Sequence, residues 1–308
     1  MSSNPFHANT AVCAYNERDV RISTPMTLVG LPPVGYTQLE TYYDAKYQTA
    51  WYYMEGQPRP CFTQTLLAEL VRWYDEVADR ATPEAAEPVR YLVAASKVPG
   101  VFNLGGDLDL FQRLIRQRDR QGLLNYARAC IEPLYRNMVS LERDVTTISL
   151  VQGDALGGGF EGALSSNVLI AERSARMGLP EVLFNLFPGM GAYSFLSRRV
   201  GPALAERIIL SGRLYTAEEL HGMGVVDVVA DDGDGEMAVY RYIEQERRAH
   251  NAHRAVRAVR QLVSPVTREE LLQVTEIWVN AALRLEDRDL RKMDRLVARQ
   301  NHKAASAA

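Results

Sequence analysis

Two glycine-containing turns stand where backbone donors could meet a ligand. The first reads F-N-L-G-G-D at residues 102–107, and the second reads Q-G-D-A-L-G-G-G-F-E at residues 152–161. Each turn follows a predicted strand and opens a predicted helix, whose first N–H groups have no acceptor inside the helix. Glycine lets a ligand oxygen approach such N–H groups closely. The pair of turns therefore indicates a site for an oxygen that carries negative charge.

A dinucleotide phosphate loop is one alternative for these turns. The second turn lacks the G-x-G-x-x-G spacing, and no acidic residue ends a second strand in the expected context. We therefore expect no nucleotide cofactor, and no metal or redox cofactor is implied.

Histidines and cysteines offer no competing site. His250 and His253 stand three residues apart on a predicted helix, but no third ligand accompanies them, so we expect surface or interface positions. Cys13, Cys61 and Cys130 are widely spaced and odd in number, which favours reduced thiols over a disulfide framework.

A basic cluster follows the first turn along the chain. Its members are Arg113, Arg116, Arg118, Arg120 and Arg128. Such a cluster near the expected mouth of the site could receive an acidic carrier protein. A solvated helix face is the alternative interpretation.

The elements that must position the turns alternate along the chain. Aromatic residues from Leu39 to Glu55 predict two strands, and apolar residues at helical spacing from Thr65 to Arg80 predict a helix. A short buried strand is expected at Tyr91–Ser96, before the first turn. A long helical region is expected after that turn, from about Leu108 to Glu142.

The second turn lies between a strand at Thr146–Gln152 and a helix, and a further strand follows at Asn167–Glu172. Helices are expected from about Met237 to the C-terminus. This succession predicts an α/β fold. We expect three parts: an N-terminal extension at residues 1–35, a core domain at residues 36–236 and a C-terminal helical region at residues 237–308.

The charge balance and the hydropathy pattern limit which partners we expect the protein to bind and where in the cell we expect it. The 308 residues include 35 Lys and Arg against 38 Asp and Glu, so the formal net charge is −3 and no global field attracts nucleic acid. The first residues lack the basic and apolar parts of a signal peptide. The longest apolar stretch, Ile148–Ile170, is interrupted by Asp154, Glu161 and five glycines, which a membrane span would not tolerate. We expect a cytoplasmic protein that does not enter a membrane.

The motifs around the turns resemble those of the crotonase (enoyl-CoA hydratase/isomerase) superfamily. The two turns are followed, in the family's order and spacing, by M-G-L-P-E at residues 177–181 and F-P-G-M-G at residues 187–191. The resemblance runs from about Tyr36 through residues 210–229 into the C-terminal helices. It implies the crotonase spiral of strand-strand-helix units, with a C-terminal helical trimerisation region and a homotrimer or a dimer of trimers.

The resemblance also implies the site residues. In the family the two turns supply an oxyanion hole, which the N–H groups of Leu104 and Gly158 would form here. Glu161 and Glu181 match the two catalytic glutamates of the hydratases. The expected substrate-binding residues are Gly105, Gly157, Phe184, Phe187, Met190 and Trp278. Ordinary core packing is the alternative for the last four.

Such a constellation suits the loss of water from a 3-hydroxyacyl thioester. Two N–H donors stabilise the enolate-like charge on the thioester oxygen, and one such donor can be worth about 3 kcal/mol. Two carboxyl groups divide the proton transfers, one ionised as base and one protonated as acid, and burial side by side separates their pKa values. The alternatives are stabilisation of a helix N-terminus for Glu161 and a solvated loop carboxylate for Glu181.

Within the superfamily, the segments L-G-G-G-F-E-G-A-L-S-S-N and G-L-P-E-V-L-F-N-L-F-P-G-M-G-A-Y look like those of the diffusible signal factor (DSF) synthases of RpfF type. That resemblance implies dehydration of a medium-chain 3-hydroxyacyl acyl carrier protein to the cis-2-enoyl thioester. It also implies hydrolysis that releases a free fatty acid used in quorum sensing.

The carrier and the function stay open at this stage, and so does which of the two glutamates is the base. The family's N-A-L segment is replaced by Cys61-Phe62-Thr63, which leaves both CoA and acyl carrier protein as carriers. An enoyl-CoA hydratase of fatty-acid degradation is an alternative function. A non-catalytic crotonase-fold protein that binds a regulatory partner, such as a sensor protein, is another.

Overall fold

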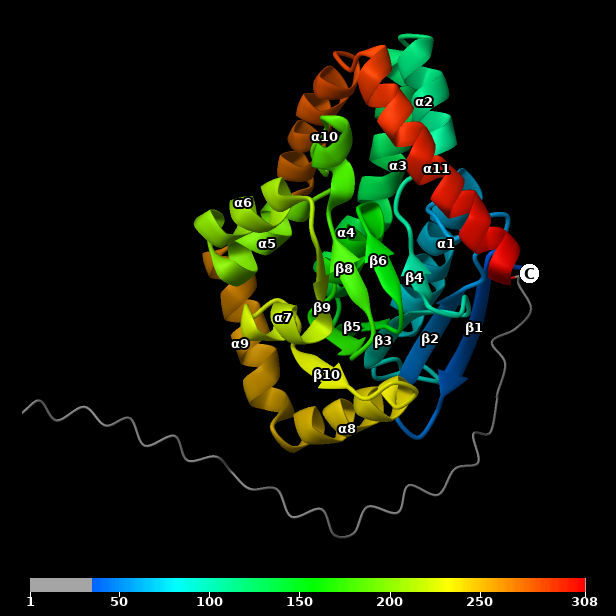
Figure 1. Ribbon diagram of the computed structural model, residues 1–308. Coiled ribbons are helices and arrows are strands. Elements are labelled where there is room, and N and C mark those ends of the chain that lie inside the picture. The colour runs from blue at the N-terminus through cyan, green and yellow to red at the C-terminus, as the bar shows by residue number, and fades with distance from the viewer. Residues whose placement is uncertain (1–34, 308) are drawn as a thin grey trace, which may run out of the picture.

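Ten strands form two sheets in the computed structural model of this protein, which describes residues 35–307 (Figure 1). The strands are β1 (Leu39–Asp44), β2 (Thr49–Met54), β3 (Tyr91–Ser96), β4 (Val101–Asn103), β5 (Thr146–Val151), β6 (Asp154–Leu156), β7 (Val168–Glu172), β8 (Arg176–Gly178), β9 (Leu214–Thr216) and β10 (Val228–Ala230).

Helices connect and cover these strands. They are α1 (Gln64–Arg80), α2 (Leu108–Arg116), α3 (Arg120–Met138), α4 (Gly158–Leu164), α5 (Ala192–Val200), α6 (Pro202–Ser211), α7 (Ala217–Gly222), α8 (Gly235–Arg248), α9 (His250–Val263), α10 (Arg268–Ala282) and α11 (Asp287–Ala307). Short 3-10 helices span Ser140–Glu142 and Pro180–Phe184. None of the helices in the described part of the chain is both long and apolar enough to cross a bilayer.

The larger sheet has the strand order β1-β2-β3-β5-β7-β10, and only the β1-β2 pair is antiparallel. The smaller sheet has the order β4-β6-β8-β9, with a parallel arrangement except at β8-β9. Because parallel strands all point the same way, the ends of β4 and β6 lie at one edge of the smaller sheet. Those two ends lead directly into the two glycine turns.

The residues of strand β2 show that the larger sheet is buried on both faces. All six of its residues are buried. Successive side chains of a strand point to opposite faces, and here Tyr52 joins the main core while Trp51 and Tyr53 join a second core covered by α8. The rings of Trp51, Tyr42 and Tyr53 all contact one another on this face, with centroids 5.6 to 5.9 Å apart. The crowded aromatic residues therefore build the sheet itself.

The predicted elements are largely present, with two differences. The strands expected within residues 39–55, 91–96, 146–152 and 167–172 all form, as does the helix at residues 65–80. The long helical region is broken after α2, because Arg118 adopts a positive φ of 53° and the Asp119 side chain caps α3 by accepting from Gly122 N–H. The three-residue strands β4, β6, β8, β9 and β10 were not predicted.

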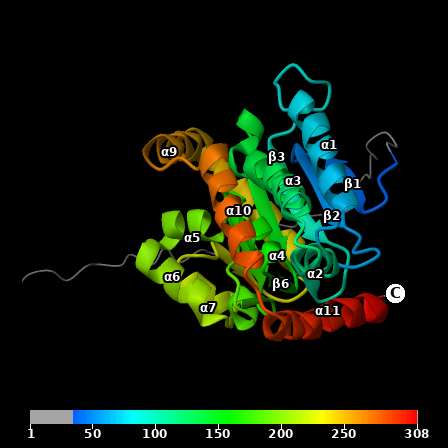
Figure 2. The ribbon, with the colours of Figure 1, turned by 90° about the horizontal axis from the view of Figure 1, so that it is seen from above.

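The C-terminal helices wrap around the body that the strands form. Figure 2 shows α10 beside α3 and α11 beside α2, contacts that the structure also gives pairwise. Helix α9 differs from the others because none of its residues is buried. The boundary expected at residues 236–237 falls inside α8, which packs on β5 and β7. The division into core and helical parts therefore stays a prediction, and most of the N-terminal extension lies outside the described residues.

Candidate active site

The two glycine turns meet at the edge of the smaller sheet. A Cβ atom at Gly158 would lie only 3.3 Å from Gly105 Cα and 3.3 Å from Gly106 N. A Cβ atom at Gly105, where φ is +91°, would lie 2.7 Å from Leu156 O. The backbones of the turns can approach this closely because neither carries a side chain at these positions. Donors from segments fifty residues apart therefore share one small space.

The first turn corrects the predicted donor. The N–H of Leu104 donates to Pro60 O at 2.7 Å, so the proposed oxyanion donor is engaged inside the protein. The peptide group between Gly105 and Gly106 behaves differently, because its carbonyl, Gly105 O, accepts from Phe62 N–H at 2.8 Å. The C=O and N–H of a trans peptide point in opposite directions. The N–H of Gly106 therefore points away from Phe62, on the side where Gly158 lies.

Glu161 lies in the first turn of α4, as predicted, and is 1% exposed. Its Oε1 accepts from Met190 N–H at 2.8 Å and from Ala192 N–H at 3.0 Å. Met190 belongs to the F-P-G-M-G segment that leads into α5, and Ala192 is the first residue of that helix. The carboxyl group is therefore anchored by two backbone donors and is not a solvated helix cap.

Glu181 reaches the same space from the 3-10 helix after β8. The residue is partly exposed, but its Oε2 is buried and has no hydrogen-bond partner among residues 35–307. Its Oε1 occupies the space that a Cβ atom at Gly157 would need. Gly157 has a φ of +52° and so supplies both the turn and the room for this carboxyl group. A buried oxygen without a protein partner is available to interact with a bound substrate.

The two carboxyl groups differ in how their surroundings treat a negative charge. Burial raises the pKa of Glu161, and the amides of Ala192 and Met190 counteract that rise. Burial also raises the pKa of Glu181, and the nearby charge of Glu161 raises it further. Glu161 is therefore the first of the pair to ionise, and Glu181 holds its proton to higher pH.

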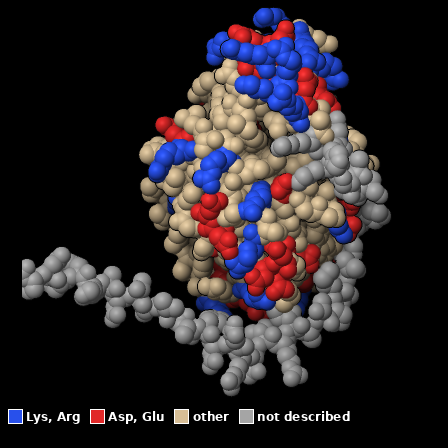
Figure 3. All heavy atoms as spheres, viewed as in Figure 1, with Lys and Arg blue, Asp and Glu red and all other residues tan. Residues whose placement is uncertain are grey.

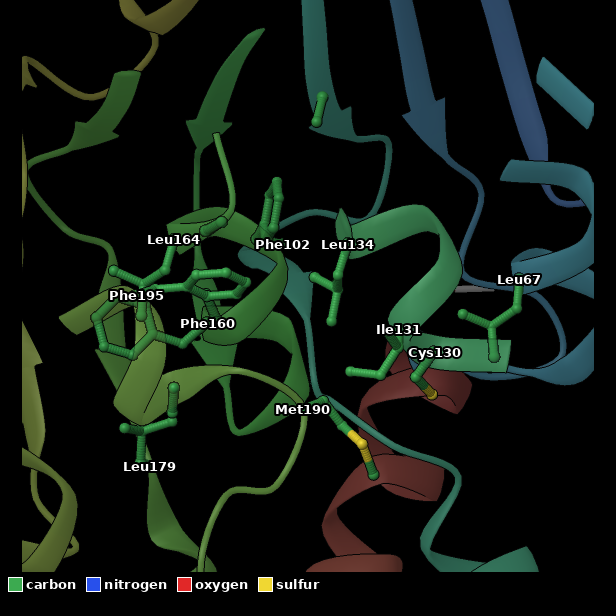
Figure 4. Close-up of a cluster of buried hydrophobic side chains, with 14 of the residues drawn as sticks. Leu67, Phe102, Cys130, Ile131, Leu134, Phe160, Leu164, Leu179, Met190 and Phe195 are labelled. Carbon is green, nitrogen blue, oxygen red and sulfur yellow. The ribbon is translucent and has the colours of Figure 1, made fainter. Parts of the chain in front are cut away.

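Both glutamates and both turns line one cavity of about 450 Å³. Most of its wall is apolar or aromatic and comes from β2, α1, α3 and the loop before α5. Representative lining residues are Tyr52, Leu67, Tyr74, Phe102, Leu134 and Leu156. Its volume and lining are those of a pocket for a small or medium apolar ligand. Figure 4 shows Leu67, Cys130, Leu134 and Met190 within the cluster of buried side chains beside this space.

The cavity includes most of the predicted substrate-binding positions. Its lining contains Leu104, Gly105, Gly157, Gly158, Phe184, Met190 and Trp278. Phe187 is the exception: it does not belong to the lining and instead packs half-buried against the main core. Three tyrosines that line the cavity were not predicted to do so: Tyr52, Tyr74 and Tyr126. Tyr74 lies on the helical face that Leu67 and Leu70 already marked as buried, so that periodicity was a usable signal.

Of the remaining candidates, Cys130 lines the cavity, whereas the histidines and the arginine cluster do not. His250 is near Asp144 and Glu246, 3.8 and 3.9 Å away, and within residues 35–307 no three His, Cys, Asp or Glu groups gather as a metal site. Cys61 and Cys130 are buried free thiols, and Cys13 lies outside the described residues. Arginines of the predicted basic cluster pair with acidic residues of the C-terminal helices. Arg120 pairs with Glu276 at 2.6 Å, and Arg116 pairs with Asp294 at 3.7 Å. In Figure 3 basic and acidic side chains mix at the top of the molecule.

The sequence matches the model of one protein family and is similar to several curated proteins. The enoyl-CoA hydratase/isomerase family model matches residues 59–292. The mitochondrial methylglutaconyl-CoA hydratase of Rattus norvegicus is 34% identical over 154 residues, which cover 50% of this chain and 46% of that protein. The human counterpart is 30% identical over 178 residues, 58% of this chain and 50% of that protein. The chain thus spans about half the length of these curated relatives.

Solved structures show the same fold. Human mitochondrial delta3-delta2-enoyl-CoA isomerase superposes with a TM-score of 0.71 at 19% identity, covering 86% of this chain and 99% of that one. Pseudomonas aeruginosa DspI superposes with a TM-score of 0.63 at 25% identity, covering 79% of this chain and 95% of that one. These likenesses confirm the predicted crotonase-type α/β fold. Together with the sequence match, they show that the chain belongs to the enoyl-CoA hydratase/isomerase family of the crotonase superfamily.

Proposed function

We propose that this protein catalyses the interconversion of a 3-hydroxyacyl thioester and its 2-enoyl thioester. The observation that carries the proposal is the pair of buried carboxyl groups, Glu161 and Glu181, at two adjoining glycine turns in one apolar cavity. One carboxyl group favours the ionised form and the other the protonated form. Addition of water removes one proton from oxygen and delivers one to carbon, so it needs an ionised and a protonated carboxyl group at once.

The thioester oxygen would lie between two backbone N–H groups. Gly158 is the first residue of α4, so its N–H has no acceptor inside the helix. Gly106 replaces Leu104 as the second donor, because its peptide group is turned toward Gly158 by the bond between Phe62 and Gly105. Donors fixed in this way stabilise the enolate-like oxygen without having to reorganise.

The two glutamates would carry the protons in both directions. When water adds, ionised Glu161 takes a proton from water, and protonated Glu181 delivers one to the α-carbon. Dehydration is the reverse: Glu181 as carboxylate removes the α-proton, and protonated Glu161 donates to the departing hydroxyl, so that water leaves. The number of protons on the pair is the same before and after each reaction, so no other acid or base is required.

The finer proposal is a DSF-type synthase that acts on a medium-chain acyl carrier protein thioester and hydrolyses the product to a free cis-2-enoic acid. It is supported by the apolar cavity and by the resemblance at residues 179–193. Hydrolysis would use the same oxyanion donors, because attack of water on the thioester also places charge on that oxygen.

An enoyl-CoA hydratase is the second candidate, since the names of the curated relatives include CoA hydratases. Product analysis separates the two. Purified protein is incubated with 3-hydroxydecanoyl thioesters of acyl carrier protein and of CoA, and the products are identified by mass spectrometry and gas chromatography. The synthase releases a free cis-2-enoic acid from the carrier-protein substrate, whereas the hydratase leaves trans-2-enoyl-CoA intact. If neither product forms, the proposed reaction is rejected.

A further inference from the structure

One tyrosine hydroxyl joins the two segments that hold the first glycine turn. Tyr126 lies on α3 and is 1% exposed. Its hydroxyl donates to Phe62 O and accepts from Asp107 N–H at 3.1 Å. Phe62 and Asp107 are separated by 45 positions in sequence, and the turn lies between them in space. The hydroxyl is therefore placed to fix the turn's backbone.

The direction of the Gly106 N–H depends on this arrangement. Phe62 N–H holds Gly105 O, which sets the plane of the peptide between Gly105 and Gly106. Tyr126 holds the opposite end of the Phe62 residue and also the next peptide, through Asp107 N–H. Two successive glycines have wide conformational freedom. Without the hydroxyl, Phe62 O and the peptide that follows Gly106 would each lose a contact, and the Gly105–Gly106 peptide between them would be held less firmly.

The tyrosine itself is rigidly supported. Its ring meets Phe111 edge to face, with centroids 5.0 Å apart and an interplanar angle of 86°. Helix α3 is capped by Asp119, about two turns before Tyr126. We propose that Tyr126 is a positioning residue, which orients the Gly106 N–H toward the thioester oxygen without touching the reacting atoms. This inference rests on the proposed function, in which the Gly106 N–H is one of the two donors to the thioester oxygen.

Tyr126→Phe tests the inference, and Tyr43→Phe is its matched control. Tyr43 is another buried tyrosine whose hydroxyl donates to a backbone carbonyl, Pro88 O, at 2.7 Å, but it lies on β1 and does not belong to the cavity lining. We expect Tyr126→Phe to lower kcat about 10- to 100-fold, which is less than the roughly 10²- to 10³-fold loss on removing a donor altogether. KM and the midpoints of the pH profile should stay nearly constant, and Tyr43→Phe should change kcat by less than about 3-fold.

A spectroscopic readout makes the inference independent of turnover. Decanoyl-pantetheine labelled with ¹³C at the carbonyl lacks the 3-hydroxyl group and so cannot lose water, and its spectrum is recorded before the thioester is hydrolysed. Its C=O stretch should shift to lower frequency on wild-type protein and on Tyr43→Phe, and should return toward the free value on Tyr126→Phe. Thermal unfolding of all three proteins shows whether the two substitutions cost similar stability.

Each result decides the question. The inference is wrong if Tyr126→Phe keeps the wild-type carbonyl shift and kcat, if both variants lose activity in proportion to stability, or if wild-type protein shifts the carbonyl not at all. If the shift disappears only in Tyr126→Phe while no 3-hydroxyacyl thioester is turned over, the positioning role stands and the proposed reaction is rejected.

Discussion

Glu161 and Glu181 share one buried site but meet different neighbours, and this difference supports the roles proposed for them. Glu161 accepts from two backbone N–H groups, whereas Oε2 of Glu181 has no partner among residues 35–307. The motif alone predicted the pair but left open which was acid and which was base. The distinction depends on amides at Met190 and Ala192, thirty residues along the chain, whose direction only the folded loop determines.

Replacing either glutamate tests its part in the reaction. Glu161→Gln and Glu181→Gln each keep the side chain's shape and remove its proton exchange. We expect each to lower the rate of dehydration by roughly 10²-fold or more, measured as kcat with the preferred thioester. Circular dichroism should show an unchanged fold. Near-normal turnover in either variant would remove that residue from the mechanism.

The raised pKa of Glu181 also predicts a pH-dependent stability. Because its folded pKa lies above its unfolded value, this group's stabilisation is fully present below the unfolded pKa and is lost as pH rises through the folded pKa. Glutamine cannot ionise and avoids that loss. We expect Glu181→Gln to unfold at a temperature a few degrees above wild type at pH 8.5, with no such gain at pH 5. A difference in unfolding temperature that is constant between these pH values would contradict the buried titration.

At the scale of elements, local patterns predicted the long elements and missed those that only tertiary contacts create. Helix α1 and strand β2 show clear periodicity and hydropathy, so their positions followed from the sequence. Strands β6 and β8 have three residues each and form because they pair with one another. The same reason explains the error at Leu104: its N–H is taken by Pro60, a residue whose position beside the turn no local pattern reveals.

The junction of β4, β6 and α4 leads to a prediction for Gly158. A Cβ atom there already lies 3.3 Å from two backbone atoms of the first turn, and the methyl groups of valine would fill the space of the thioester oxygen. Gly158→Val should abolish both dehydration and hydrolysis, because both develop charge on that oxygen. Gly222→Val is the control, since a side chain in that position meets nothing within 4 Å. Loss of only one reaction would show that the two reactions use different donors.

At the scale of the whole molecule, the outward face of α9 leads to a prediction about assembly with further copies of the chain. Val256, Val259, Leu262 and Val263 are all exposed, the last two by 81% and 75%. Exposed apolar clusters of this kind mark interaction surfaces. The homotrimer or dimer of trimers expected from the family resemblance would bury this face, as a C-terminal trimerisation region requires.

Replacing two of these residues tests the assembly. Val259→Asp combined with Leu262→Asp should shift the mass measured by light scattering toward that of a monomer, because charges would have to be buried in the interface. Leu210→Asp is the matched control, since Leu210 is 67% exposed but lies on α6. A wild-type protein that is already monomeric at micromolar concentration would contradict the prediction, and so would a double variant with unchanged mass.

The carrier protein raises the last question at this scale, because the structure changes what the arginine cluster can do. Arg120 and Arg116 are exposed but paired with Glu276 and Asp294, so the cluster is a mixed surface and not an uncompensated basic one. An acidic carrier would have to compete with those acids for the arginines. Replacing Arg116 and Arg120 by Glu should still raise KM for an acyl carrier protein substrate and weaken its dependence on salt, while a small pantetheine thioester should react as before.

A charge swap separates recognition from stability in that test. Arg120→Glu combined with Glu276→Arg restores an ion pair between α3 and α10 but moves the positive charge to the other helix. If Arg120 contacts the carrier, KM for the carrier-protein substrate should stay raised in the swapped protein. If the ion pair matters only for holding α10 in place, the swap should restore KM, and a solvated helix face becomes the correct interpretation of the cluster. Equal KM values for wild type and all variants would leave CoA as the favoured carrier.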